Sequence, residues 1–340
     1  MVVGMTVMRN ANVVVRDLSA LEALGGVTNI CSDKTGTLTQ GAMIVKKVWL
    51  PKIGIYTVNN STDPNDPTQG DVTIGPESTK TSVPNRIIDY DSQRSAAALK
   101  FDVPLEKVTK DQLKVKHTAE ELAGITPELE EFLRSTALCN LATVKHETVD
   151  EKNSKWLTTG EPTEIALQVF ANRFDYGKKR LKSEGWNQVA EFPFDSSIKR
   201  MSVVYKSPRT RESFVFTKGA VERVLDLCST IGTSSIYEPI TEDLKEQVLG
   251  QMDEFANQGQ RVLAIASKKW NGDFPEQHGS NVDDMRANVE SGLMLLGLVG
   301  IYDPPRDETK GAIRECSEAG IKVHMLTVSQ HSTDFGLALT

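Results

Sequence analysis

The residues best placed to carry out chemistry lie near the N-terminus, where Asp33 opens the sequence DKTGTLT. An aspartate carboxylate at the end of a strand can attack phosphorus and form an aspartyl phosphate. The threonines and the glycine beside it would let backbone and side chains approach a phosphoryl group, and Lys34 adds positive charge. Such a reaction also needs a divalent metal, which neutralises charge on the transferred group. Taken alone, such a sequence is more often just an ordinary turn. It is not a P-loop, because the glycine spacing before Lys34 is absent.

Three apolar runs each predict a buried strand that ends at a polar residue. They are residues 27–32 before Asp33, residues 293–302 before Asp303, and residues 321–326 before Thr327. Pro304-Pro305 starts a helix that ends at Gly320. Its inward face is expected to carry Ala312, Ile313, Cys316 and Ala319. This β-α-β order predicts parallel strands with a right-handed crossover. Open α/β sheets bind ligands beyond the carboxyl ends of their strands, so we expect a site there.

The residues between these strands predict a second domain. Residues 57–95 are rich in Asn, Asp, Pro, Thr, Ser and Gly and predict a long surface loop. Residues 127–142 have helical periodicity, and another helix is expected near Pro162, because proline suits the first helical turn. The first of these helices should place Leu129, Phe132, Leu133 and Leu138 on one face. Alternating runs at 188–192, 201–205, 213–217 and 262–266 predict strands of an antiparallel sheet.

The predicted fold is therefore an α/β domain that is split by an inserted α+β domain. We expect the split domain to comprise residues 10–50 and 292–327, with the insertion at residues 51–291. Residues 328–340 form a tail that belongs to neither.

Composition excludes several classes of protein. The chain has 39 basic and 46 acidic residues and no long basic run, so nucleic acid is not an expected partner. The four cysteines lie far apart, which argues against a zinc site or a disulfide framework and favours reduced cytosolic thiols. No apolar run reaches the ~20 residues that span a bilayer, so the chain taken alone is expected to be soluble.

The motif at Asp33 resembles the signature of P-type ATPases, members of the haloacid dehalogenase-like superfamily. Other blocks that resemble this family follow in the family's order over roughly residues 10–327. They are GEPTE at 160–164, FPFD at 192–195 through KRM at 199–201, KGA at 218–220, QRVLAIA at 260–266 and DPPR at 303–306. The blocks look most similar to the fungal sodium/potassium-efflux branch, type IID. The resemblance implies a haloacid dehalogenase-like phosphorylation domain split by a nucleotide-binding domain.

The resemblance also implies a role for each site residue. Asp33 would be phosphorylated, and Asp33 and the Thr35 carbonyl would bind Mg²⁺. Phe194 would stack on adenine, Glu164 would accept from the adenine amino group, and Lys218 would line the same pocket. Arg261 has the planar fork suited to phosphate oxyanions. The full nucleotide-binding set implied is Thr35, Thr163, Glu164, Phe194, Lys199, Lys218, Arg261, Asp303, Arg306 and Thr327.

The activity implied is ATP hydrolysis coupled to cation transport, with ATP and Mg²⁺ as cofactors and sodium or potassium as cargo. The location implied is the cytoplasmic side of the plasma membrane, reached through helices that are absent from this chain. The alternatives are an ATP-binding module without turnover, or an incomplete gene product.

The sequence departs from the family after Met325-Leu326-Thr327. The family continues with Gly-Asp and later with a Gly-Asp-Gly-x-Asn-Asp hinge, whereas this chain continues with Val328-Ser329. We therefore expect this chain alone not to turn over ATP, because metal and phosphate ligands are missing. The tail, residues 328–340, is expected to be translated intron sequence, since Val-Ser can be encoded by a common 5′ splice site. A drifted paralogue is the alternative.

Overall fold

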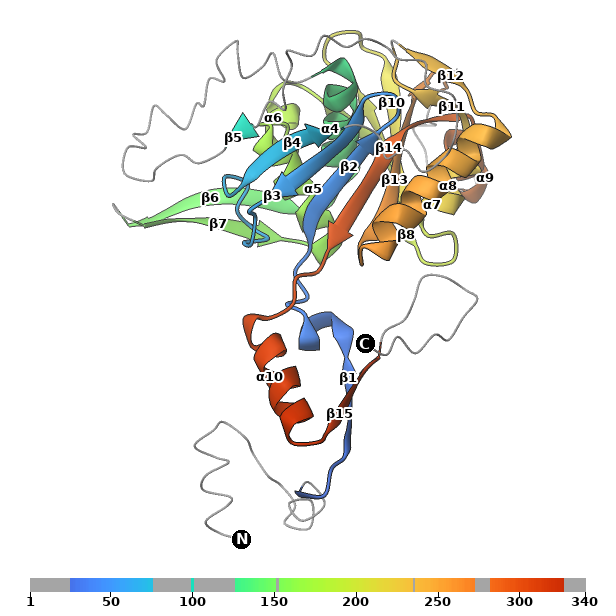
Figure 1. Ribbon diagram of the computed structural model, residues 1–340. Helices are drawn as coiled ribbons and strands as arrows, with labels where there is room; N and C mark the ends of the chain where they lie inside the picture. Colours follow the sequence, from blue (N-terminus) through green and yellow to red (C-terminus); the bar gives the residue numbers. More distant parts are fainter. Residues whose placement is uncertain are drawn as a thin grey trace. The chain divides into compact units, whose positions relative to one another are not determined.

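The computed structural model describes residues 25–75, 99–100, 126–150, 153–234, 236–272 and 282–326. They form two compact units (Figure 1). The smaller unit combines the chain up to Ala42 with the chain from Asp303 onward, and the larger unit runs from Met43 to Tyr302. Residues 43–50 and 292–302, which we assigned to the split domain, therefore lie in the larger unit.

A mainly antiparallel sheet forms the centre of the larger unit. Its strands are β2 (Ile44–Leu50), β3 (Gly54–Asn59), β4 (Asp71–Gly75), β5 (Leu99–Lys100), β8 (Asn187–Asp195), β9 (Arg200–Lys206), β10 (Ser213–Ala220), β11 (Cys228–Gly232), β12 (Tyr237–Pro239), β13 (Arg261–Trp270) and β14 (Leu293–Tyr302). They lie in the order β5-β4-β3-β2-β14-β13-β10-β9-β8, with β11 beside β14 and β12 beside β11. Among the described pairs of this sheet, only β11 with β14 is parallel. The four predicted alternating runs are confirmed as β8, β9, β10 and β13.

The predicted β-α-β unit is wrong, because β14 belongs to this sheet. It pairs antiparallel with β13 on one side and with β2 on the other. Eight of its ten residues are buried. A continuous apolar run fits any strand that is covered on both faces, so it does not distinguish a parallel sheet from the centre of an antiparallel one.

Helices cover both faces of the sheet (Figure 1). They are α4 (Pro127–Leu138), α5 (Pro162–Arg173), α6 (Lys178–Ser183), α7 (Val221–Leu225), α8 (Glu242–Asn257) and α9 (Val282–Val289). Alternate residues of one strand point to opposite faces. On β9, Val203 accordingly packs in the core with α4 and α5, whereas Val204 packs in the core with α7 and α8.

The two predicted helices of the larger unit are confirmed. Thr126 caps α4 by accepting a hydrogen bond from the Leu129 amide at 3.2 Å, and Pro127 occupies the first turn. The predicted inward face of α4 is fully buried. The helix ends at Leu138, four residues earlier than predicted. Beyond it, the Asn140 side chain accepts from the Ala142 amide at 2.8 Å, which stabilises a turn instead of another helical turn.

The predicted loop at 57–95 is wrong in part. Strand β3 extends to Asn59, and β4 pairs with it antiparallel. Arg173 fixes the segment between them by donating to the Ser61 hydroxyl at 2.6 Å and to the carbonyls of Pro67 and Gln69. Residues 76–95 lie outside the described residues. Strands β6 (Thr143–Asp150) and β7 (Asn153–Thr159) form a separate antiparallel ribbon.

The smaller unit contains β1 (Asn29–Asp33), the turn Lys34–Leu38, α10 (Asp307–Glu318) and β15 (Lys322–Leu326). Strand β1 pairs parallel with β15, from Asn29 beside Lys322 to Asp33 beside Leu326. The strand after Gly320 and the helix stop are confirmed, since α10 ends at Glu318 and Gly320 has φ of +74°. The predicted burial is wrong, because β1 is largely exposed and α10 has no buried residue. The described sheet here has only two strands, so little is packed against either face.

The described part of the chain contains no helix with the length and apolar character needed to cross a membrane. Thr327 and the predicted tail at 328–340 lie outside the described residues, as do residues 10–24.

Candidate functional site

An ion pair between Glu164 and Lys218 lies at the centre of the candidate site in the larger unit. Glu164 is in the first turn of α5, and Lys218 is near the end of β10. The Lys218 Nζ donates to the Glu164 carboxylate at 2.5 Å, and the Lys218 and Glu164 side chains are only 8% and 12% exposed. The second carboxylate oxygen accepts from the Leu141 amide at 3.1 Å. Both oxygens therefore have protein donors.

The chain after α4 fixes the position of Glu164. The fully buried Asn140 side chain donates to the Glu164 carbonyl at 2.9 Å. Lys178 donates in turn to the Asn140 carbonyl. Burial of this lysine lowers its pKa, and the positive charge of Lys182 acts in the same direction. Burial raises the pKa of the neighbouring Cys139 thiol to about 12. Glu164 is therefore held directly by Asn140 and Leu141, and indirectly by Lys178 through Asn140.

A second contact places Arg261 beside the same helix. Arg261 is the first residue of β13, and its guanidinium donates to the Thr163 hydroxyl at 3.2 Å. The arginine is exposed. Thr163 precedes Glu164, and the first turn of α5 therefore contacts both β10 and β13.

The turn that joins β8 to β9 lies at the same end of the sheet. Phe194 lies in β8, the last strand in the order of the sheet, and its side chain is 63% exposed. The Lys199 amide donates to the Asp195 carbonyl at 2.7 Å, and the Lys199 carbonyl accepts from the Ala220 amide at 2.9 Å. The second bond joins this turn to the end of β10, two residues after Lys218.

Gly219 lets the turn come this close. A Cβ atom at position 219 would lie 2.6 Å from the Lys199 carbonyl oxygen and 2.6 Å from the Arg200 Cβ. Any other residue would therefore push the strands apart. The glycine of the KGA block has a packing role that the sequence alone did not indicate.

The DKTGTLT segment forms the candidate site of the smaller unit. Asp33 is exposed at the end of β1, and Thr35 is exposed in the following turn. Gly36 adopts φ of +78°, which favours glycine. The Gly36 amide donates to the Thr39 hydroxyl at 3.2 Å. The hydroxyl in turn donates to the Asp303 carboxylate at 2.6 Å. The other Asp303 oxygen accepts from the Gly41 amide at 3.0 Å.

Arg306 also holds this segment. Its guanidinium donates to the Gly36 carbonyl at 2.9 Å and to the Thr37 carbonyl at 3.2 Å. Asp303 and Arg306 were both predicted to bind nucleotide, and here both contact the turn after Asp33. Their role toward a nucleotide stays a prediction, and Thr327 lies outside the described residues.

The donors near Asp33 can be compared with those that magnesium uses in proteins. The described residues contain no group of three or more His, Cys, Asp or Glu side chains arranged for a metal. The oxygens of Asp303 are already occupied by Thr39 and Gly41, whereas Asp33 and Thr35 are exposed. Magnesium commonly uses one or two protein oxygens together with water and substrate phosphates. Asp33 and Thr35 fit that mode of binding and would hold the ion that neutralises phosphoryl charge.

A buried cluster beside the turn that contains Lys199 was missed by the sequence analysis. Glu290 is fully buried and receives hydrogen bonds from Arg200 at 2.6 Å and Arg286 at 2.9 Å. The spacing of Arg286 and Glu290, four residues apart, was the one available signal, and it is also typical of exposed helical pairs.

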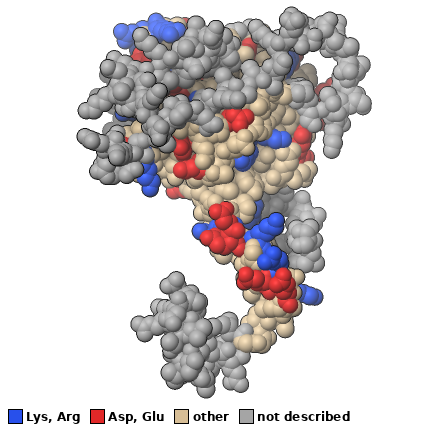
Figure 2. Space-filling view, turned by 60° about the vertical axis from the view of Figure 1, so that its left-hand side comes forward, with Lys and Arg blue, Asp and Glu red and all other residues tan. Residues whose placement is uncertain are grey.

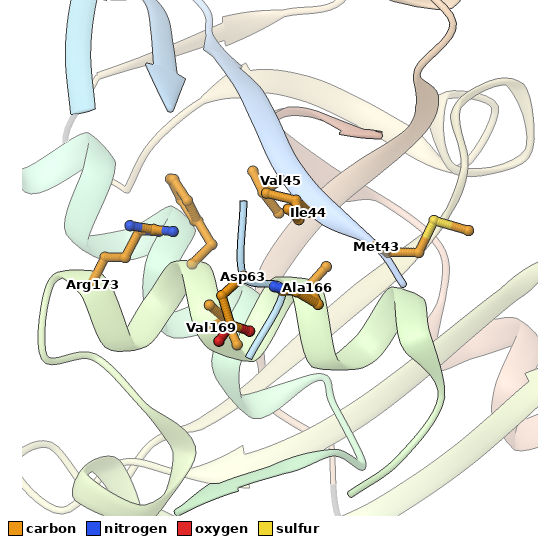
Figure 3. Close-up of a pocket in the computed structure, with 9 residues that line it drawn as sticks. Met43, Ile44, Val45, Asp63, Ala166, Val169 and Arg173 are labelled. Atoms are coloured by element: carbon orange, nitrogen blue, oxygen red, sulfur yellow. The ribbon is translucent and has the colours of Figure 1, made fainter. Parts of the chain in front are cut away.

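Figures 2 and 3 show the charges on one face of the molecule and a pocket beside α5. Figure 2 shows charges of both signs, some in adjoining groups, with no extended basic area among its coloured residues. Figure 3 shows a pocket between β2 and α5, lined among others by Met43, Val169 and Arg173. The pocket is too narrow to admit water, and none of its lining residues belongs to the predicted nucleotide-binding set. It is therefore a packing gap.

Comparisons with known proteins show which family the chain resembles. The family model described as "P-type ATPase, cytoplasmic domain N" matches residues 128–308. The sodium/potassium exporting P-type ATPase cta3 of Schizosaccharomyces pombe is 41% identical over 99% of this chain and 28% of that protein. Sodium/potassium exporting P-type ATPase 1 of Saccharomyces cerevisiae is 37% identical over 96% of this chain and 31% of that protein.

More distant relatives include the calcium-transporting ATPase 1 of Bacillus cereus, which is 32% identical over 99% of this chain and 28% of that protein. The chain thus spans less than a third of the length of these relatives. The family match covers α4 through the start of α10 and includes Glu164, Phe194, Lys218 and Arg261. This chain belongs to the P-type ATPases and contains their cytoplasmic domain N.

Proposed function

We propose that this chain is the nucleotide-binding and phosphorylation region of an ATP-driven cation exporter. The larger unit binds ATP at the end of the sheet where Glu164, Lys218, Arg261 and Lys199 gather. The smaller unit is a haloacid dehalogenase-like phosphorylation domain, split by the larger one, and Asp33 accepts the phosphoryl group.

The observation that carries the nucleotide site is the pair of contacts from one helical turn. Glu164 contacts Lys218, and the adjacent Thr163 contacts Arg261. Residues from α5, β10 and β13 therefore converge, as a binding site requires. The exposed Phe194 ring supplies a flat apolar surface on which an adenine can stack. Arg261 supplies a cation whose planar fork suits phosphate oxygens.

The exposed carboxylate of Asp33 supports the phosphorylation step. A carboxylate oxygen of Asp33 forms a bond to the γ-phosphorus, the bond from that phosphorus to the ADP oxygen breaks, and ADP leaves with the electron pair. Asp33 and the Thr35 carbonyl hold Mg²⁺, which neutralises charge on the transferred group. Asp303, Thr39 and Arg306 keep the turn beside Asp33 in place.

The names of the relatives favour sodium and potassium as the transported ions. The matching family model is described as a cytoplasmic domain, and we propose that this region lies at the cytoplasmic side of the plasma membrane. Both statements concern the longer protein that such relatives represent.

A calorimetric titration of the 340-residue chain with ATP tests the nucleotide site. We expect saturable binding that Phe194→Ala weakens by about 1–3 kcal/mol, because one base stack is lost. Tyr237→Ala is the matched control, since Tyr237 is a similarly exposed aromatic residue at 62% and lies outside the site. Equal affinities in the two variants would contradict the site. Any hydroxylamine-sensitive phosphoenzyme formed with labelled ATP should disappear in Asp33→Asn.

A further inference from the structure

A buried ion cluster lies next to the turn that contains Lys199. The Glu290 carboxylate accepts from Arg200 Nε at 2.6 Å through one oxygen. Its other oxygen accepts from Arg286 Nε at 2.9 Å and from the Ser202 hydroxyl at 2.8 Å. Glu290 is fully buried, and the side chains of Arg200 and Arg286 are only 16% and 12% exposed. A carboxylate at this depth is stable only with such partners.

The cluster also holds the backbone of the turn. Arg286 Nη2 in α9 donates to the Arg200 carbonyl at 3.0 Å. Glu290, the residue that follows α9, contacts the Arg200 side chain, so both the main chain and the side chain of Arg200 are held. The neighbouring Lys199 adopts φ of +52°, a left-handed conformation that residues with a side chain rarely occupy. Such a conformation persists where the surrounding contacts fix it. Here those contacts are the cluster on Arg200 and the bond from the Ala220 amide to the Lys199 carbonyl.

We propose that Glu290 is a positioning residue for nucleotide binding. By fixing Arg200, it holds Lys199 in the left-handed conformation that directs its side chain toward the bound nucleotide. This inference rests on the proposed nucleotide site and adds to it a residue 72 positions beyond Lys218 in the chain. Glu290 does not touch the ligand and acts through Arg200 and Lys199.

A double-mutant cycle in the 340-residue chain tests this role, with ATP affinity as the readout. We expect Glu290→Gln to weaken ATP binding by about fivefold to tenfold in the otherwise unchanged chain. In a Lys199→Ala background the same substitution should change the affinity by less than about twofold, because the side chain that it positions is gone. A general loss of structural integrity would instead weaken binding equally in both backgrounds. Glu212→Gln is the control, since Glu212 forms an exposed ion pair with Lys269 at the opposite end of β10.

The outcomes separate this inference from the proposed function. If the unchanged chain does not bind ATP, the proposed nucleotide site fails and the positioning role fails with it. If it binds ATP but Glu290→Gln has no effect, or has the same effect in both backgrounds, only the positioning role is wrong. Should Glu290→Gln not fold, Arg200→Lys replaces it in the cycle, because a lysine keeps the charge but loses the planar fork. The same criteria then apply.

Discussion

Lys218 Nζ lies 2.5 Å from Glu164 Oε1, although the two residues are 54 positions apart and come from a strand and a helix. The pair is nearly buried, and the Leu141 amide occupies the second carboxylate oxygen. The helix α5 and the strand β10 are therefore joined by a charged contact at the predicted nucleotide site. Removal of one partner leaves the other charge buried without compensation.

We expect Lys218→Met to destabilise the larger unit by about 3 kcal/mol, because a buried carboxylate loses its cation. Glu164→Gln combined with Lys218→Met should cost less than the sum of the two single substitutions. Urea unfolding of the three variants measures this. The exposed pair Glu242–Lys245 provides the control, and Lys245→Met should cost less than about 1 kcal/mol. Additive effects at Glu164 and Lys218 would contradict an energetic coupling between them.

Gly219→Ala should destabilise the chain by about 1–3 kcal/mol, because the new methyl group would overlap the Lys199 carbonyl and Arg200. Gly250→Ala is a suitable comparison, because a Cβ at position 250 meets nothing within 4 Å. Position 250 is inside α8, so alanine there should stabilise the chain by about 0.5–1 kcal/mol. Thermal unfolding gives both values, and a neutral Gly219→Ala would show that the strands are not in close contact.

Thr39→Val should loosen the turn after Asp33. The substitution removes the hydroxyl that accepts from the Gly36 amide and donates to Asp303, and it leaves an oxygen of Asp303 without that donor. Hydrogen exchange at Gly36 should become faster, whereas Thr37→Val, at an exposed position, should leave it unchanged. The same exchange rate in both variants would mean that Thr39 does not hold the turn.

The free energy of unfolding should fall as the pH rises through and beyond the ordinary pKa of a thiol. Burial raises the pKa of Cys139 and of Cys228 to about 12. The folded chain therefore keeps two protons that the unfolded chain releases from its ordinary thiol pKa upward. Each thiol should contribute a loss of up to about 1.4 kcal/mol per pH unit over this window, and none at lower pH. Denaturant unfolding between pH 8 and about pH 10 should give a shallower slope for the double variant Cys139→Ala, Cys228→Ala. Parallel slopes would contradict the shifted pKa values.

The sequence by itself determined two helices and four strands of the larger unit, and these were the elements with the clearest local signals. Pro127 and Pro162 each occupy the first turn of a predicted helix, and Leu129, Phe132 and Leu133 form the buried face of α4. These features depend on residues within a few positions of one another, where proline geometry and side-chain periodicity act directly. The ordered family blocks likewise predicted that Glu164 and Lys218 belong to one site, and the two side chains are in contact.

Only the tertiary structure decided which strands pair and which charges meet. The apolar run at Leu293–Tyr302 is compatible with a parallel or an antiparallel sheet, and its pairing with β2 and β13 places it in the larger unit. The meeting of Arg200 with Glu290 depends on strand register and on the packing of α9. The physical reason is that such contacts join residues far apart in the chain, 90 positions for Arg200 and Glu290, and no periodicity or turn signal extends over such distances.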